Sequence, residues 1–132
     1  MPPEEPTAGS PADWLRHAQS DLELAGVKPP EGVLWEGLCF LTQQATEKAI
    51  KAVLLRAGIP FPKTHSIGTL LDLLPDRIEL PGTMADASEL TEYAVMTRYP
   101  GEHEPVTQED HRRALAIARS IVQWAREIVE QE

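Results

Sequence analysis

Arg98 and His103 are the residues whose types and spacing best suit chemistry on a phosphate group. A guanidinium keeps its positive charge and can hold a phosphate as negative charge develops on it. An imidazole titrates near neutral pH and can take a proton from a ribose hydroxyl or give one back. The two residues stand five positions apart, across a Pro-Gly turn. This pair has the groups that a metal-independent ribonuclease needs.

The same two residues also have an ordinary structural interpretation. Arg98 is expected at the end of a helix, where the helix dipole favours a cation. His103 is expected in an exposed loop, where an imidazole needs no role. The spacing alone favours this second interpretation, so the chemical one depends on the rest of the chain.

Four further residues are candidates for binding. Glu47 and Lys51 stand four positions apart on an expected helix, so they can pair with each other or line a cleft beside Arg98. Lys48 and Lys51 can be solvated or can attract phosphate. Tyr99 can stack on a base beside the pair or pack against the helix end. By contrast, we expect His65 to organise the start of a short helix.

Several other chemistries are excluded. The sequence has no glycine-rich phosphate loop, no Cys-x-x-Cys pair and no serine in a nucleophile-elbow context. The histidines are dispersed, so we expect no metal site and no cofactor. The single cysteine, Cys39, excludes an internal disulfide and fits a reducing, cytoplasmic location. No apolar run approaches the roughly 20 residues that cross a membrane.

Length and charge set further limits. The chain has 132 residues and a net charge of −9, which suits one domain and argues against nucleic-acid binding through overall charge. The charge is uneven, since residues 48–71 carry four bases and no acids. Residues 72–110 carry ten acids and two bases, and residues 111–132 carry four bases and three acids.

Apolar spacing and end signals predict helices throughout. We expect long helices at about 13–26, at about 32–57, from Thr83 to before Pro100, and from Thr107 onward, with a short helix before Pro75. The resulting fold is an all-α, up-and-down four-helix bundle with an additional short helix. Residues 1–10 are predicted to be a flexible tail, and residues 11–132 a single helical domain. Helix 32–57 is apolar around so much of its circumference that it lies at the centre of the bundle or also dimerises.

The order of these motifs resembles the HEPN family, the helical domains named for higher eukaryotes and prokaryotes nucleotide-binding. The resemblance covers about residues 13–130 and is carried by four blocks: Trp14–Leu22, Gln43–Ala52, Lys63–Ile67 and Tyr93–Gly101. It implies a helical bundle that dimerises and, in active branches, a metal-independent endoribonuclease that leaves cyclic-phosphate ends. The family motif is an Arg and a His separated by four to six residues, which Arg98 and His103 match.

The resemblance therefore implies two functions. In the first, the protein is a ribonuclease, the toxin of a pair with a minimal nucleotidyltransferase as antitoxin, and the motifs of two protomers form a composite site. In the alternative, it is a non-catalytic module that binds a nucleotide or partners a nucleotidyltransferase. The alternative follows from Tyr99, which stands directly after the motif Arg where active members often carry a small polar residue, and from the helix-breaking Pro100 that follows it.

Overall fold

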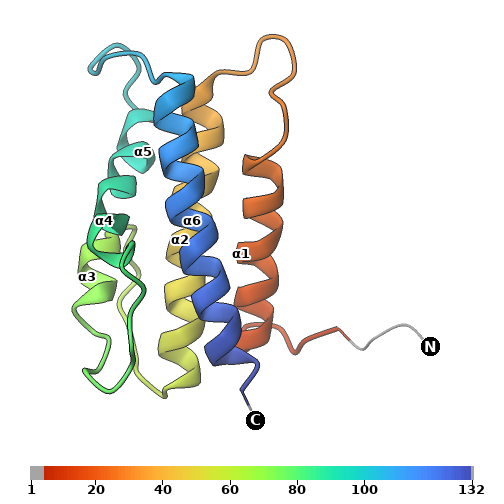
Figure 1. Cartoon of the computed structure of the whole chain (residues 1–132), viewed down its shortest axis with the longest axis vertical. Helices are drawn as coiled ribbons and strands as arrows, with labels where there is room; N and C mark the ends of the chain where they lie inside the picture. Colours follow the sequence, from red (N-terminus) through yellow and green to blue (C-terminus); the bar gives the residue numbers. More distant parts are fainter. Residues whose placement is uncertain (1–4, 132) are drawn as a thin grey trace.

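The computed structural model describes residues 5–131, which form an all-α bundle with no strand in that range (Figure 1). The elements, in chain order, are α1 (Pro11–Ala25), α2 (Trp35–Arg56), α3 (Ile67–Leu71), α4 (Met84–Ala87), a 3-10 turn (Ser88–Leu90), α5 (Thr91–Met96) and α6 (Gln108–Val129). The predicted fold class is confirmed. The predicted tail falls partly on residues 1–4, which lie outside the described residues, so the domain boundary after residue 10 stays a prediction.

The helix ends follow the end signals of the sequence with one exception. Ser10 caps α1, since its Oγ accepts from the Asp13 N–H at 3.2 Å. Thr107 and Asp110 form a reciprocal capping box at the start of α6. The exception is Thr83, which directly precedes α4 but makes no side-chain cap there. The Thr83 hydroxyl instead donates to Ser120 Oγ at 2.7 Å, which ties this segment to α6.

The predicted fourth helix is divided into α4, the 3-10 turn and α5. The division lies where the segment changes its neighbour, because α4 packs against α6 whereas the 3-10 turn and α5 pack against α2. Ala87, Leu90 and Ala94 all remain buried across the division. The three pieces follow one another along the same side of the bundle (Figure 1).

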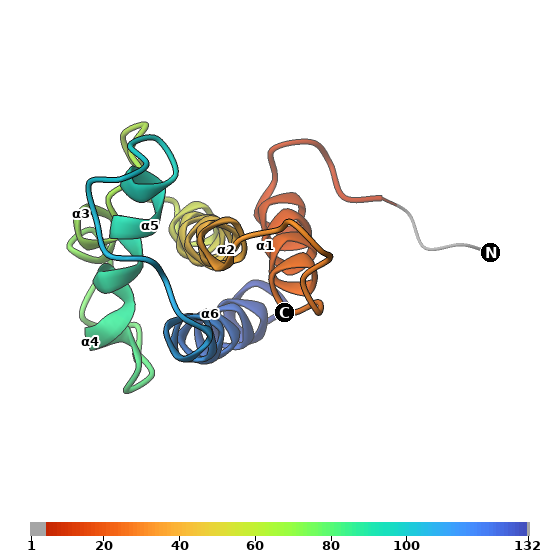
Figure 2. The same ribbon diagram turned by 90° about the horizontal axis from the view of Figure 1, so that it is seen from above.

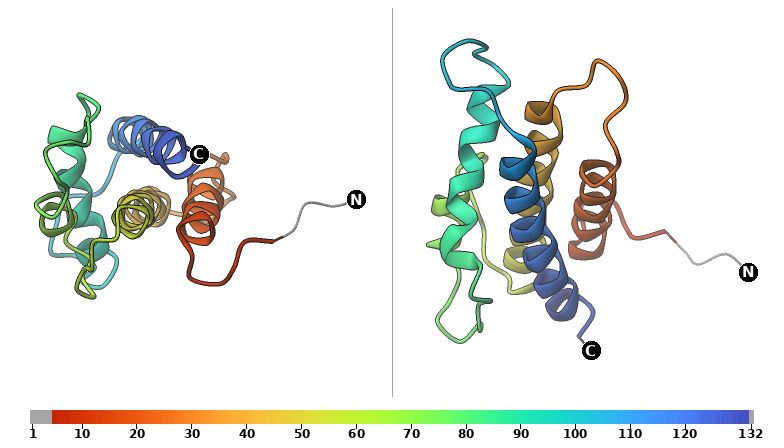
Figure 3. Two further views of the ribbon diagram at one scale, coloured as in Figure 1. Left: turned by 90° about the horizontal axis from the view of Figure 1, so that it is seen from below. Right: turned by 45° about the horizontal axis from the view of Figure 1, so that its top comes forward.

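Helix α2 lies at the centre of the molecule. It packs against α1, α6, α5 and α3, and the views along the bundle show it between α1 on one side and α3 and α5 on the other, with α6 across them (Figures 2 and 3). Its fully buried apolar side chains include Ile50, Val53 and Leu54. The wide apolar surface that the sequence gives this helix is therefore used within one chain, and it does not by itself require a second copy.

A pair of identical substitutions tests this central position. Leu54 on α2 is fully buried, whereas Leu24 on α1 is 54% exposed. We expect Leu54→Ala to lower the free energy of unfolding by about 2–5 kcal/mol, because it removes buried methyl groups and leaves a cavity. Leu24→Ala is expected to have a much smaller effect, as measured by urea denaturation of both variants. Equal losses in the two variants would contradict the central placement of α2.

Candidate active site

The residues between α5 and α6 form an exposed turn, Thr97–His103, which we call the motif turn. α5 ends at Met96, and the Arg98 N–H still donates to the Val95 carbonyl at 3.0 Å. Gly101 has a φ of +88°, a left-handed conformation that favours glycine and reverses the chain after Pro100. The arginine thus stands just beyond the helix end, as predicted, and its side chain is exposed.

The imidazole of His103 is held by the chain next to it. Its Nδ1 lies 2.7 Å from the carbonyl oxygen of Glu104. A carbonyl oxygen only accepts hydrogen bonds, so Nδ1 donates, and the neutral ring has an unprotonated Nε2. Within the described residues Nε2 makes no hydrogen bond. The ring is therefore oriented with a proton acceptor at its far side, as a general base requires.

His103 separates two surface pockets. One, of about 460 Å³, lies between the motif turn and the start of α2 and includes Leu34 and Gly101. The other, of about 350 Å³, lies along α5 and includes Val95 and Tyr99. Met96, like the histidine, lines both pockets. The histidine is thus accessible from two sides, in a surface that is largely apolar.

Arg98 and His103 make no contact with each other through hydrogen bonds in the described part of the chain. Arg98 lines neither of the two pockets. Its side chain makes no hydrogen bond or ion pair within residues 5–131. Within residues 5–131, no hydrogen bond fixes the position of one side chain relative to the other.

Glu47 is the centre of a buried polar network in the middle of α2. Its carboxylate accepts from Gln43 Nε2 at 3.1 Å, from Lys51 Nζ at 3.1 Å and from His65 Nδ1 at 2.8 Å. Gln43 also donates to the backbone carbonyl of His65 at 3.3 Å. Side-chain exposure is 5% for Glu47 and 8% for Lys51. The network attaches the segment before α3 to α2, and it satisfies a charge that burial would otherwise make costly.

The two candidate lysines are also engaged within the chain. Lys51 Nζ lies 5.5 Å from the ring centroids of both Trp14 and Phe61, close enough for cation–π contacts. Lys48 Nζ donates to the Asp21 carboxylate at 2.6 Å. Across residues 5–131, no hydrogen bond or ion pair joins either lysine, or Glu47, to the motif turn.

The role of His65 was only partly foreseen. The hydroxyls of Thr64 and Ser66 accept from backbone N–H groups at the start of α3, so the organising role predicted for His65 belongs to its two neighbours. The imidazole itself reaches back to Glu47, and its ring remains 54% exposed. The sequence did contain one signal for this contact. Glu47 is a carboxylate on a largely apolar helix, so it must find hydrogen-bond donors within the protein. Sequence distance concealed this partner, since the two residues are 18 positions apart.

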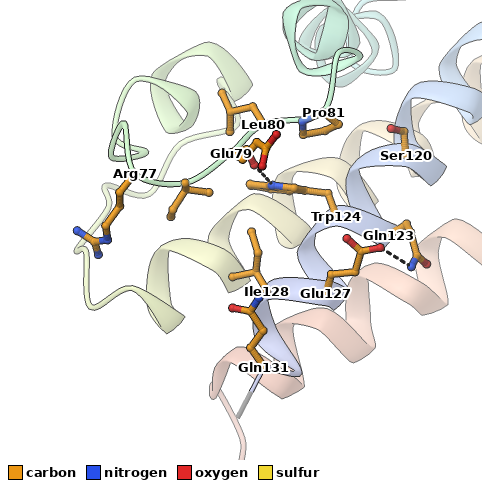
Figure 4. Close-up of a pocket in the computed structure, with 11 residues that line it drawn as sticks. Arg77, Glu79, Leu80, Pro81, Ser120, Gln123, Trp124, Glu127, Ile128 and Gln131 are labelled. Atoms are coloured by element: carbon orange, nitrogen blue, oxygen red, sulfur yellow. Dashed lines mark hydrogen bonds between the residues drawn. The ribbon is translucent and has the colours of Figure 1, made fainter.

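A further pocket, of about 580 Å³, lies toward the C-terminal half of α6, at the other end of the bundle from the motif turn (Figures 1 and 4). The indole ring of Trp124 forms part of the pocket wall, and its N–H donates to the Glu79 carbonyl at 2.8 Å. Gln123 donates to Glu127 at its rim. No histidine or cysteine lines this pocket, so it offers no group that titrates near neutrality.

Other reactive groups are not placed for chemistry. Burial raises the pKa of the Cys39 thiol to about 12, so that it stays protonated at neutral pH. Burial also raises the pKa of Tyr93. No group of His, Cys, Asp and Glu side chains that could hold a metal ion is found between residues 5 and 131. In the same range, no helix has the length and apolarity needed to cross a bilayer.

Comparison with known proteins assigns this arrangement of helices to a family. The family model of the HEPN domain matches residues 11–128 of the sequence, which is nearly all of the described chain. The chain belongs to the HEPN family. No functionally curated protein matches it.

Two crystal structures are similar along almost their entire length. One is TT1696 from Thermus thermophilus, with 32% identity and a TM-score of 0.74, covering 89% of this chain and 97% of that one. The other is ST0689, an archaeal HEPN homologue, with 30% identity and a TM-score of 0.71, covering 92% of this chain and 98% of that one. The HEPN fold is thus shared in sequence and in shape.

The Glu47 network predicts a strong dependence of stability on one carboxylate. Glu47→Gln leaves the Lys51 ammonium buried without its counter-charge, which we expect to cost about 3–5 kcal/mol in urea denaturation. Glu130→Gln is the matched control, since Glu130 forms an exposed i,i+4 pair with Arg126. Adding Lys51→Met to Glu47→Gln should recover part of the loss. Similar losses in the two single variants would contradict the importance of the network.

Proposed function

We propose that the protein is a metal-independent endoribonuclease of HEPN type. One observation carries the proposal: within a HEPN domain, Arg98 and His103 lie on the same exposed turn at the family's motif spacing. The orientation of His103, with Nδ1 donating to a carbonyl and Nε2 making no hydrogen bond within the described residues, supports its use as a proton acceptor. The exposure of Arg98 supports its use on an incoming phosphate.

The proposed reaction is internal transesterification of RNA. The ribose 2′-oxygen forms a bond to the adjacent phosphorus while its proton passes to His103 Nε2. The bond from phosphorus to the 5′-oxygen breaks, and that oxygen takes a proton from a protonated imidazole. The products are a 2′,3′-cyclic phosphate and a 5′-hydroxyl end. Arg98 stabilises the charge that develops on the non-bridging oxygens.

A homodimer is part of the same proposal. Leu34 and Val95 beside the motif turn are 66% and 54% exposed, and Tyr99 within it is 55% exposed, so three large exposed apolar side chains are grouped on this surface. A second copy seated on this surface would cover them and bring a second Arg98–His103 pair beside the first. One imidazole could then act as base and the other as acid, and each Arg98 could reach the phosphate at the partner's motif turn.

The proposal also includes a cellular setting. By resemblance to HEPN toxins, the partner is a minimal nucleotidyltransferase that acts as antitoxin, and the location is the cytoplasm, which the free thiol of Cys39 supports. The binding role predicted for Glu47, Lys48 and Lys51 belongs to this proposal as well. It has less support from the geometry, because each of these residues already has a partner within the chain.

The alternative of a non-catalytic nucleotide-binding or partner-binding module has one observation in its favour. Arg98 and His103 share no hydrogen bond in the described part of a single chain, and Pro100 stiffens the turn between them. Such a module would keep Arg98 for phosphate and would not need His103. The experiment below separates the two functions, since only the ribonuclease cuts RNA.

The test of catalysis is cleavage of single-stranded RNA in the presence of a chelator. We expect the wild type to release cyclic-phosphate ends, and Arg98→Ala and His103→Ala to lower the rate by about 10²-fold or more. His17→Ala, which alters an exposed histidine outside the motif, is the control and should cleave as the wild type does. Absent cleavage, or cleavage unchanged by the two motif substitutions, would reject the ribonuclease and favour the binding module.

Dimerisation has a separate test in light scattering. At micromolar concentration we expect the mass of two 14.6 kDa chains. Val95→Glu places a charge in the proposed interface and should give single chains with reduced cleavage. Leu80→Glu alters an exposed apolar residue at the pocket near Trp124 and should leave the dimer intact. A wild-type mass of one chain would refute the composite site.

A further inference from the structure

The motif turn is poorly suited to hold a polyanion by itself. Between residues 91 and 111, which include the motif turn, the sequence carries five acids, and its one Lys or Arg is Arg98. Glu92 and Glu102 line a pocket together with His103. An RNA strand that reaches this turn meets repulsion from these carboxylates. Most of its binding energy must therefore come from cations elsewhere on the surface.

Helix α6 has the required cations. Between residues 111 and 126 it carries Arg112, Arg113, Arg119 and Arg126 and no acid, in a chain whose net charge is −9. The helix begins at Gln108, directly after the loop that contains His103, and runs the length of the bundle (Figure 1). A basic surface on this helix therefore starts close to the motif turn and leads away from it.

Three of these arginines lie on one side of α6. Spacings of four and three residues alternate along this side of the helix, and such spacings place residues in a single line. The line contains residues 112, 116, 119, 123 and 126. They are Arg112, Ala116, Arg119, Gln123 and Arg126, and all are exposed. We call them the α6 arginine stripe. At 1.5 Å per residue the stripe is about 21 Å long, with an arginine at about every second turn.

The C-terminal part of the stripe forms one wall of a groove between α1 and α6, of about 530 Å³. Arg119, Gln123 and Arg126 line it from α6, and Gln19 and Glu23 line it from α1. Arg119 Nη2 would lie only 3.3 Å from a Cβ built on Gly26, so the glycine leaves room for the guanidinium. The groove has two arginines against one acid, together with two amide side chains that can donate hydrogen bonds.

The arginines of the stripe are available to a ligand. Arg112 pairs with Glu109 and Arg126 with Glu130, in both cases at the surface. Such exposed pairs contribute little, so that a phosphate oxygen can replace the carboxylate. Arg119 has no acidic partner within residues 5–131. Arg113, by contrast, points to the other side of α6, where it makes two hydrogen bonds with Glu89.

We propose that the α6 arginine stripe and the groove beside it bind the phosphate backbone of single-stranded RNA and direct it to the motif turn. The inference rests on the proposed ribonuclease function and assigns the surface on which its substrate lies. An unpaired strand fits, because attack by a 2′-hydroxyl needs a backbone that can bend into line. A series of cations along a groove, with no base-specific pocket, is the arrangement that tracks a backbone without reading its sequence.

The test measures RNA binding in a His103→Ala background, in which the strand is not cut. Fluorescence anisotropy with a labelled oligouridylate longer than the groove gives Kd at several KCl concentrations. We expect Arg119→Gln to raise Kd about tenfold and to lower the slope of log Kd against log salt by about 0.7. Arg113→Gln removes the same charge from the other side of α6 and is expected to leave both quantities unchanged.

A second variant separates binding from folding, since Arg119 also lies beside the C-terminus of α1. Arg119→Lys keeps the charge and should restore most of the affinity lost in Arg119→Gln, with melting temperatures recorded for each protein. Equal Kd values for Arg119→Gln and Arg113→Gln would overturn the proposal. So would a Kd for Arg119→Lys that is no lower than that for Arg119→Gln while both proteins melt at the wild-type temperature.

The failure of this inference is distinguishable from failure of the ribonuclease. If the wild type does not cut RNA, but the Arg119→Gln substitution weakens RNA binding, the stripe stands as an RNA-binding surface and the catalytic proposal fails. If Arg98→Ala abolishes cleavage while Arg119→Gln changes neither Kd nor the cleavage of long RNA, the ribonuclease stands and the stripe is rejected.

Discussion

The burial of α2 on nearly every side is the constraint on which the rest of the structure depends. A helix in this position needs apolar side chains around its whole circumference, and it must satisfy its polar groups within the protein. Thr42 and Thr46 do so by donating to backbone carbonyls of their own helix. Glu47 does so with donors from three residues. The elements around α2 are consequently held in fixed positions, including the helix α5 that leads into the motif turn.

The proposed functional surface lies where this constraint is weakest. The motif turn touches the core chiefly through Ala94 before it and Val106 after it, and the residues between them are exposed or half-buried. The turn can thus carry a free guanidinium and an accessible imidazole without disturbing the bundle. Its apolar neighbours, Val95 and Tyr99, are left uncovered within one chain, and a second protomer is the simplest structure that covers them.

Charge distribution connects the two proposals. An acidic chain repels RNA at long range. The attraction that binds RNA must therefore come from a local group of cations and must outweigh this repulsion at short distance. Five acids and one base, Arg98, lie between residues 91 and 111, whereas α6 has no acid between residues 111 and 126. In the two proposals, the surface that holds a strand is separate from the residues that cut it, which would let an acidic protein act on a polyanion with a strong dependence on salt.

The sequence by itself determined the helical class, the family and most helix ends, because apolar spacing and capping residues act over a few neighbouring positions. It also identified Arg98 and His103 as a candidate pair, since their spacing is local. Three features were decided only by tertiary structure: the division of α4 from α5, the bond from His65 to Glu47, and the side of α6 that meets α1. Each feature depends on which helices become neighbours. That arrangement is decided by residues far apart in the sequence, because they must bury their apolar side chains in one common core.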